Sequence, residues 1–290
     1  MRARLVVTIC VALVVALSTG GASRASLPGG YTEVVGDFIG FDKCVAPSTA
    51  TMSNWWANSP YFYYGVYIGG INRACSNGNL SASWVTTVAN QGWGLQPIWV
   101  GNQAPCAGYA HPISYDVATA KQEGIDSAIN AMNTAFGFGF DIGTIIYLDI
   151  EGYSSSSTTA CRNAVNSYVN GWSFQMKQNY SSLAGAYGST CDSFVSDWAG
   201  LANVPNDVFP AAWNQVHSVW NLSCLSNPYW VGDRRIHQYN GNVNQTYGGV
   251  TLQIDPSCGL GHVAAGALGL DESDAPGTNE SNGPSEDPSC

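Results

Sequence analysis

The sequence predicts an α/β fold, a (β/α)8 barrel of the TIM type. Short apolar runs typical of strands alternate with longer segments of helical periodicity, and repeated strand–helix units form parallel sheets. Eight such units fit into a body of roughly 240 residues, the usual size of one barrel. Helical patterns are short or absent between the last strands, so a seven-stranded or partly open barrel is an alternative.

Eight strands are expected, each a short apolar run. In chain order they are Phe38–Asp42, Tyr63–Ile68, Leu95–Val100, Ile145–Glu151, Leu183–Tyr187, Val208–Trp213, Arg235–Tyr239 and Thr251–Asp255.

The clearest helices are expected over Ser114–Phe136 and Thr159–Tyr180, where apolar residues recur at helical spacing. Ser81 is a suitable N-cap for a further helix, because its hydroxyl can accept a hydrogen bond from a free backbone N–H of the first turn. Gly137 and Gly139 are expected to end the first of the two long helices.

The two ends of the chain differ in composition from its body. Residues 1–25 combine a charged start, an apolar run and small residues, which is the arrangement of a secretory signal peptide. A short N-terminal segment, 26–35, precedes the barrel at 36–268. Residues 269–290 are acidic and rich in Pro, Gly and Ser, so a disordered tail is expected. No later run is long and apolar enough to cross a bilayer, and we expect a secreted, extracellular or cell-wall associated protein.

Charge and composition limit the classes of molecule that this protein is expected to bind. Only 10% of the residues are charged, 12% are aromatic, and the formal net charge is -10. This balance disfavours nucleic acid, whose phosphates attract basic surfaces, and suits a polysaccharide. The four histidines are isolated, and no Gly-x-Ser-x-Gly elbow or phosphate-binding loop occurs. We expect no metal, no cofactor and a monomer.

Nine cysteines are present, and eight remain once Cys10 leaves with the signal peptide. An even number in an exported chain predicts disulfide bonds. Most of these cysteines follow a predicted strand, so bonds between neighbouring loops are expected. The expected pairs are Cys44–Cys75, Cys106–Cys161 and Cys191–Cys224, with Cys258 and Cys290 paired with each other or free.

Asp149 and Glu151 are the most informative candidate site residues. Because side chains alternate along a strand, both carboxylates are expected on one face, with apolar residues on the other. Two acids at the end of a strand suit the hydrolysis of a glycosidic bond. The alternative is an ordinary capping or salt-bridge role for each acid.

The barrel prediction places chemistry where the strands end, because active sites of such barrels form there. Acids, amides and aromatic side chains are expected to converge on this rim. The candidate catalytic residues are Asp42, Asp149, Glu151 and Asp255, and the candidate substrate-binding residues are Tyr67, Tyr187, Trp213, Asn214, Gln238 and Tyr239. The three aromatic residues Tyr187, Trp213 and Tyr239 are candidates for stacking on sugars, with ordinary packing as the alternative.

Several of these motifs resemble those of a known family. Gly40-Phe41-Asp42, Tyr147-Leu148-Asp149-Ile150-Glu151, His237-Gln238-Tyr239 and Ile254-Asp255 resemble, in order, the strand-end motifs of glycoside hydrolase family 25, the lysozyme-like muramidases with a barrel fold. The segments 40–47, 67–75 and 247–251 look more like a related group of secreted proteins, the glycoside-hydrolase-like domain of unknown function 1906.

The resemblance implies a role for each acid. Glu151 matches the general acid, and Asp149 matches the second acid, which stabilises the oxocarbenium-like state or assists attack. Asp42 and Asp255 match supporting acids of the first and last strands. Lys43 and Cys44 depart from the small residues usual beside the first acid.

Two functions from different classes follow. The first is a secreted glycosidase that hydrolyses β-1,4-linked amino-sugar polymers such as peptidoglycan by paired carboxylates. The second is a non-catalytic carbohydrate-binding or cell-wall binding protein on a hydrolase-like barrel. A structural or effector-like secreted protein is a smaller third possibility.

Overall fold

The structure is a computed structural model that describes residues 31–32, 38–179, 182–259 and 261–264 of the 290-residue chain. The expected signal peptide at 1–25 and the expected acidic tail at 269–290 lie outside these residues. The domain limits therefore remain predictions.

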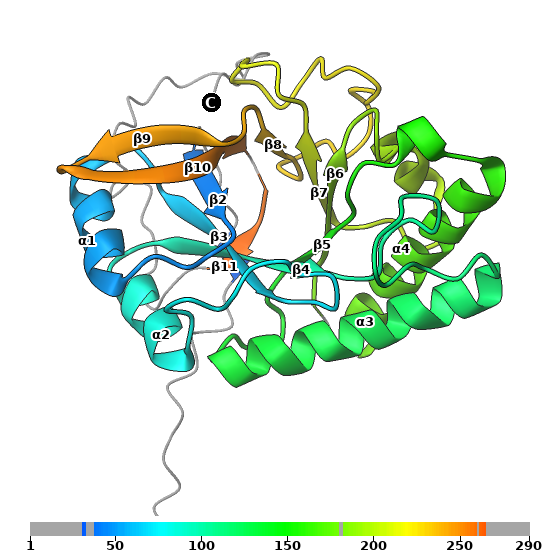
Figure 1. Ribbon diagram of the computed structural model, residues 1–290, viewed down its shortest axis with the longest axis horizontal. Coiled ribbons are helices and arrows are strands. Elements are labelled where there is room, and N and C mark those ends of the chain that lie inside the picture. The colour runs from blue at the N-terminus through cyan, green and yellow to red at the C-terminus, as the bar shows by residue number, and fades with distance from the viewer. Residues whose placement is uncertain (1–30, 33–37, 180–181, 260, 265–290) are drawn as a thin grey trace, which may run out of the picture.

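Eight strands pair side by side and close into a barrel, which confirms the predicted fold class (Figure 1). The pairing of β4 with β5 closes one side, and β10 joins β2 to β8 on the other. The barrel strands are β2 (Phe38–Lys43), β3 (Tyr63–Gly69), β4 (Gly94–Val100), β5 (Ile146–Asp149), β6 (Ala184–Ser189), β7 (Asp207–Ala211), β8 (Ile236–Gln238) and β10 (Val250–Gly259).

The last strand differs from its prediction in direction and length. The segment expected as a parallel strand over Thr251–Asp255 belongs to β10, which is antiparallel to both β2 and β8. No helix returns the chain to the start of the barrel after β8. Instead, β9 (Val243–Tyr247) and β10 form a hairpin whose two-residue turn has positive φ at Gly248 and Gly249, as a tight hairpin turn requires.

Helices cover the outside of the barrel, as the sequence predicts. They are α1 (Thr49–Asn58), α2 (Ala82–Asn90), α3 (Val117–Phe138) and α4 (Thr159–Asn179), with short 3-10 helices η1 (Ser154–Ser156) and η2 (Val195–Gly200). The hydroxyl of Ser81 caps α2 as expected, and α3 ends at Gly139, which has a left-handed backbone. In the described part of the chain no α-helix follows β7 or β8, which confirms the irregular last units.

Two apolar layers fill the molecule. The larger one lies between the strands and the helices and includes Phe41, Trp55 and Trp93. The smaller one fills the barrel interior, where the rings of Tyr63 and Tyr147 are packed against glycines of neighbouring strands. Nearer the rim on the same inward face lie Tyr67 of β3 and Asp149 of β5, so the rings of Tyr63 and Tyr147 form a floor beneath the rim.

Two short strands lie outside the eight-stranded ring. β11 (Val263–Ala264) pairs with β4 next to Leu95, and β1 (Tyr31–Thr32) pairs with β11. Leu95 lies near the amino end of β4, so these strands lie at the end of the barrel opposite to the rim.

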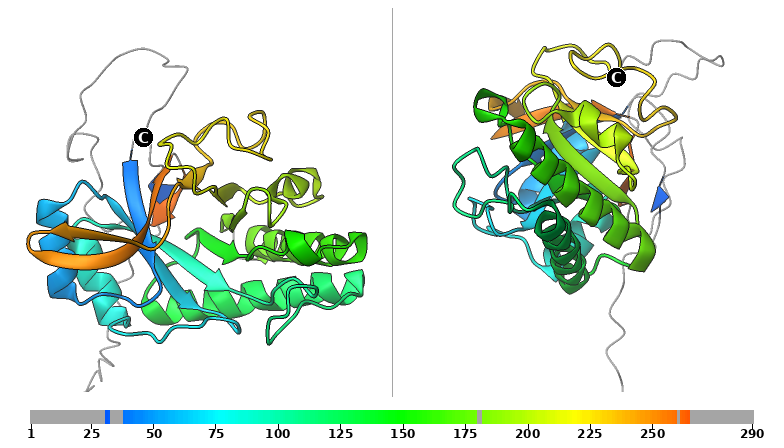
Figure 2. Two further views of the ribbon diagram at one scale, coloured as in Figure 1. Left: turned by 45° about the horizontal axis from the view of Figure 1, so that its top comes forward. Right: turned by 90° about the vertical axis from the view of Figure 1, so that its right-hand side faces the viewer.

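The long helices α3 and α4 lie side by side (Figure 2). They approach closely where each has a glycine: a Cβ on Gly124 would lie 2.0 Å from the backbone oxygen of Tyr168, and one on Gly171 would lie 2.0 Å from that of Lys121. Backbone oxygens cannot move aside as the end of a flexible side chain can. The two helices can therefore pack at this distance only with glycine at these positions.

Replacing Gly124 by Ala should lower the free energy of unfolding by about 1–3 kcal/mol, because the added methyl group forces the two helices apart. Gly137 on the same helix is the matched control, since a Cβ there meets nothing within 4 Å. Gly137→Ala should be neutral or stabilising by up to about 1 kcal/mol. Urea unfolding of both variants tests this, and equal effects in the two would contradict it.

Candidate active site at the carboxyl ends of the strands

Asp42 lies inside the barrel near the end of β2 and is 1% exposed. Its Oδ1 accepts a hydrogen bond from the Tyr67 hydroxyl at 2.9 Å, and its Oδ2 accepts one from Gln238 Nε2 at 2.7 Å. The donors belong to β3 and β8. Side chains from two other strands therefore fix the position of this carboxylate.

Asp149 is the last residue of β5 and is 2% exposed. Glu151 lies just after the strand and is partly exposed. The backbone of both residues is held by the side chain of Gln103, which is fully buried. Its Nε2 donates to the carbonyl oxygen of Asp149 at 2.8 Å, and its Oε1 accepts from the backbone N–H of Glu151 at 2.9 Å. One amide thus fixes the spacing of the two acids.

Asp255 lies directly opposite Asp42, because the antiparallel register of β10 and β2 pairs these two residues. Its Oδ1 accepts a hydrogen bond from the backbone N–H of Asn242. Asp255 lies in the middle of β10 and not at a strand end, but it still reaches the rim because β10 enters the barrel from that side.

The four carboxylates of Asp42, Asp149, Glu151 and Asp255 interact electrostatically, and we call them the four-acid cluster. Burial and then the charge of Asp255 raise the pKa of Asp42 from 3.8 to about 8. Burial and the charges of Glu151 and Asp42 hold the pKa of Asp149 well above its usual range. Groups that interact this strongly share their protons. We therefore expect the cluster to carry fewer than four negative charges near neutral pH.

The two outer acids of the cluster are also shifted. Burial, followed by the charge of Asp255, raises the pKa of Glu151. Burial raises the pKa of Asp255, while the backbone N–H of Asn242 and the charge of Lys43 oppose the shift. Glu151 is thus a carboxyl group that can hold a proton at a higher pH than an exposed glutamate.

Gln238 connects Asp42 to two aromatic residues. Its Oε1 accepts hydrogen bonds from the Tyr187 hydroxyl at 3.0 Å and from Trp213 Nε1 at 2.9 Å. The Trp213 side chain is 56% exposed and packs against Gly241, where a Cβ would lie only 2.3 Å from the ring. An anchored and exposed indole ring of this kind is a suitable surface for stacking on a sugar.

The other two predicted substrate-binding residues are engaged with the protein. Tyr239 is 7% exposed and its ring lies 4.1 Å from that of His217. The side-chain oxygen of Asn214 accepts from the backbone N–H of Val216 and so stabilises its own loop. Trp213 and Tyr187 therefore remain the better placed candidates.

His237 is buried and supports the loop that carries Trp213. Its two ring nitrogens lie 2.8 Å from the carbonyl oxygen of Ala212 and 2.7 Å from that of Ser218, at the two ends of this loop. Burial lowers the pKa of the imidazole. This arrangement indicates a structural role for His237.

Gln103 is the site residue that sequence reasoning missed. It lies in the loop after β4, and a single buried amide in a loop leaves no periodic pattern in the sequence. The available signal was its position shortly after a predicted strand, where the rim residues gather.

Disulfide bonds join the loops at the rim, and the three expected pairs are confirmed. Cys44–Cys75, Cys106–Cys161 and Cys191–Cys224 each connect segments that follow neighbouring strands. Cys258 is disulfide-bonded as well, while Cys290 lies outside the described residues. The cross-links restrict the movement of the loops that surround the four-acid cluster.

Within the described residues, no group of three or more His, Cys, Asp or Glu side chains is arranged to hold a metal ion. None of the helices found there is both long and apolar enough to cross a membrane.

The barrel and its acids define a glycoside-hydrolase-like protein, and comparison with protein families agrees. Residues 54–258 match the family described as "Rv2525c-like, glycoside hydrolase-like domain", which covers most of the chain. This protein belongs to that family. Asp42 precedes the matched residues. Comparison with curated proteins gives no match.

Solved structures show the same fold at low sequence identity. The Tat-secreted protein Rv2525c of Mycobacterium tuberculosis, solved with L-tartrate, is 15% identical with a TM-score of 0.51, over 76% of this chain and 94% of that one. The modular autolysin LytC of Streptococcus pneumoniae is 14% identical with a TM-score of 0.50, over 77% of this chain and 46% of that one. The spore cortex lytic enzyme SleM of Clostridium perfringens is 14% identical with a TM-score of 0.50, over 77% of this chain and 67% of that one.

Replacing Asp42 by Asn should stabilise the protein in alkaline solution. The raised pKa means that the folded protein binds more protons than the unfolded chain between about pH 4 and 8, so the wild type loses stability as pH rises through this range. The asparagine amide does not titrate, so the substitution removes that loss while keeping partners for Tyr67 and Gln238. We expect a gain of about 1–3 kcal/mol near pH 8 and little change near pH 4.

Urea unfolding at both pH values measures the gain from Asp42→Asn. Asp126→Asn on the exposed face of α3 is the control and should show no such pH-dependent gain. A variant at Asp42 that is no more stable than the wild type near pH 8 would contradict the raised pKa.

Replacing Gln103 by Met should destabilise the protein by about 1–3 kcal/mol, because the backbone N–H of Glu151 loses its acceptor in a buried place. Gln122→Met on the exposed face of α3 changes the same atoms and should have little effect. Chemical unfolding compares the two. Equal stability of both variants would show that the amide of Gln103 does not hold the strand end.

Proposed function

We propose that this protein is a secreted glycosidase that hydrolyses β-1,4-linked amino-sugar polymers such as peptidoglycan. The observation that carries the proposal is the four-acid cluster, in which buried carboxyl groups with raised pKa values lie beside an exposed tryptophan. Glycoside hydrolysis needs one carboxyl group that holds a proton and a second that is ionised. A cluster that shares its protons can supply both states at one pH.

Glu151 is the proposed general acid, since its pKa is raised by burial and by Asp255 while its side chain keeps some exposure to a substrate. Asp149 is the proposed second acid. Its Oδ1 is buried and has no hydrogen-bond partner among the described residues. Its pKa is also held well above the usual range by burial and by the charges of Glu151 and Asp42, so in this role it passes its proton to the rest of the cluster as positive charge develops on the sugar beside it. Asp42 and Asp255 are proposed to set the charge of the cluster.

Trp213 and Tyr187 are the proposed sugar-contacting residues, together with Tyr67 and Gln238 of the hydrogen-bond network. The choice of peptidoglycan as the polymer is supported by similarity to solved structures. LytC was also solved with a synthetic peptidoglycan ligand, and SleM is a cortex lytic enzyme. The disulfide bonds suit an oxidising, extracellular location.

A non-catalytic cell-wall or carbohydrate-binding protein is the alternative. Asp42 favours it, because both oxygens of this carboxylate are engaged by Tyr67 and Gln238, as in a structural network. Lys43 and Cys44 beside it also depart from the resembled muramidases. The two functions differ in whether glycan chains are cut.

Incubation of the protein with insoluble peptidoglycan tests the proposal. The wild type should release muropeptides, and Glu151→Gln should lower the rate at least about 100-fold, because proton transfer to the leaving group is lost. The wild-type rate should fall as pH rises above the pKa of Glu151. Asp126→Asn should release muropeptides at the wild-type rate.

Sedimentation of the same mixtures separates the alternatives. Binding of wild type and Glu151→Gln to the polymer without any release would favour the non-catalytic binder. If the protein neither binds the polymer nor releases muropeptides, the result would favour a structural or effector-like protein.

A further inference from the structure

A hollow of about 300 Å³ lies away from the four-acid cluster. Its walls include Lys177 near the end of α4, Asn206 just before β7 and Arg234 shortly before β8. These three residues come before the amino ends of parallel strands, whereas the acids lie near the carboxyl ends. The hollow is therefore at the other end of the barrel and separate from the candidate active site.

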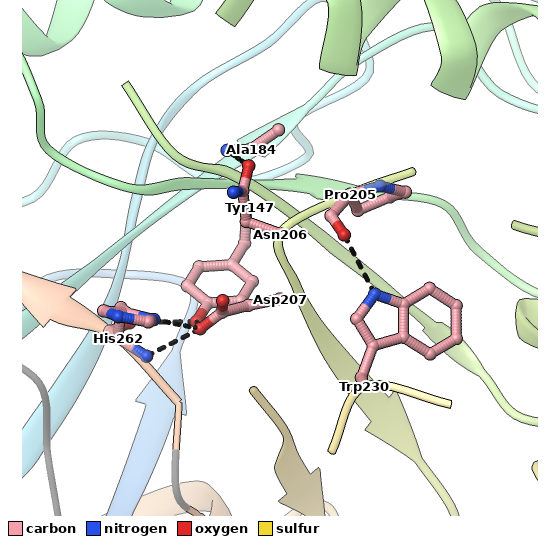
Figure 3. A network of polar contacts seen from close by, with 7 residues as sticks. All are labelled: Tyr147, Ala184, Pro205, Asn206, Asp207, Trp230 and His262. Atoms are coloured by element: carbon pink, nitrogen blue, oxygen red, sulfur yellow. Dashed lines mark hydrogen bonds and ion pairs between the residues drawn. The ribbon is translucent and has the colours of Figure 1, made fainter. Parts of the chain in front are cut away.

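The floor of this hollow is fixed by hydrogen bonds (Figure 3). Trp230 Nε1 donates to the carbonyl oxygen of Pro205 at 2.9 Å. Asn206 is paired with Ala184 of β6 twice: its side-chain oxygen accepts from the Ala184 N–H at 3.0 Å, and its own N–H donates to the Ala184 oxygen at 2.7 Å. A ligand would thus meet a shape that exists before it binds.

The charge in the hollow is positive. Lys177 is partly exposed and Arg234 is exposed, and none of the lining residues is an Asp or a Glu. Asp207, which follows Asn206 along the chain, is turned away: its Oδ2 contacts His262 Nδ1 at 2.8 Å and the Tyr147 hydroxyl at 3.3 Å inside the barrel (Figure 3). Asp233, which precedes Arg234, is not among the residues that line the hollow. The two cations therefore face the hollow without a carboxylate from its walls.

Two neighbouring cations repel each other unless an anion lies between them. Burial, followed by the charge of Arg234, lowers the pKa of Lys177. Such a pair is unusual here, because the chain has only ten Lys and Arg residues against twenty Asp and Glu. Lys177 donates one hydrogen bond, to the carbonyl oxygen of Val204, and an ammonium group has three donors.

We propose that this hollow binds a phosphate ester. The guanidinium of Arg234 offers a planar pair of donors and Lys177 offers a point charge, and together they suit the several oxygens of a phosphate. The ring of Tyr229, which is 39% exposed, and the wall at Pro205 provide surface for the carbon atoms of the ester. The ester could come from a small phosphomonoester or from the phosphodiester chain of an anionic polymer.

Calorimetric titration of the purified full chain tests the proposal with three probes: glycerol 1-phosphate, a glycerol phosphate trimer joined by phosphodiesters, and acetate. We expect saturable binding of a phosphate probe, weakened by salt. Tighter binding of the trimer identifies a polymer as the source, and equal binding identifies the single ester. Acetate binding as tight as that of both phosphate probes would overturn the assignment to phosphate.

Arg234→Gln should weaken the binding about tenfold, the loss expected for one charge-assisted hydrogen bond. Lys177→Met, which keeps the length of the side chain, should weaken it similarly. The control is Lys121→Gln on α3, which removes the same charge elsewhere. Absence of saturable binding, an unchanged affinity in Arg234→Gln, or an equal loss in Lys121→Gln would each overturn the proposal.

Release of muropeptides by Arg234→Gln should equal that of the wild type, since the hollow lies far from the acids along the strands. The phosphate site and the proposed hydrolysis can therefore fail independently. Thermal unfolding of Arg234→Gln checks that the variant is folded as the wild type is.

Discussion

The burial of carboxyl groups without an ion-pair partner is the constraint on which the rest of this structure depends, and Lys43 only lowers the pKa of Asp255 from a distance. Among the described residues, no Lys, Arg or His forms an ion pair with any member of the four-acid cluster. Below the acids lie aromatic rings such as Tyr63 and Tyr147, which exclude water. A buried charge without a partner is costly, so protons take the place of counter-ions. The Tyr67 hydroxyl and the Gln238 amide are neutral donors, so they hold Asp42 in place without removing its need for a proton.

The antiparallel direction of β10 makes this arrangement possible. A parallel eighth strand would end at the rim and present one acid from its last residue. The hairpin of β9 and β10 enters from the rim instead, and its register sets Asp255 opposite Asp42. Asn54 and Trp55 of α1 donate hydrogen bonds to backbone oxygens at the turn end of the hairpin, which fixes that end beside α1 (Figure 1). The same strand, β10, thus closes the barrel and brings Asp255 opposite Asp42.

Sequence reasoning succeeded where the physical signal is local. The strand–helix alternation predicts the barrel, and the position of the cysteines after strands predicts the pairs Cys44–Cys75, Cys106–Cys161 and Cys191–Cys224. The direction of β10 was missed because strand direction depends on the connection. The signal for that connection, a two-glycine turn at Gly248 and Gly249, lay outside the run Thr251–Asp255 taken as the strand. Gln103 was missed because its role depends on two backbone groups far along the chain, at Asp149 and Glu151.

The distribution of charge along the barrel axis bears on how the proposed hydrolysis and the proposed phosphate site would act together. The rim holds the four acids, and the opposite end holds Lys177 and Arg234 in a hollow of the wall. A fully ionised acid cluster would repel an anionic polymer, and shared protons reduce that repulsion at the rim. A phosphate bound at the opposite end would leave the rim open to a neutral stretch of glycan. Two weak contacts on one polymer then act at a high effective concentration, so the protein could remain attached between cleavage events.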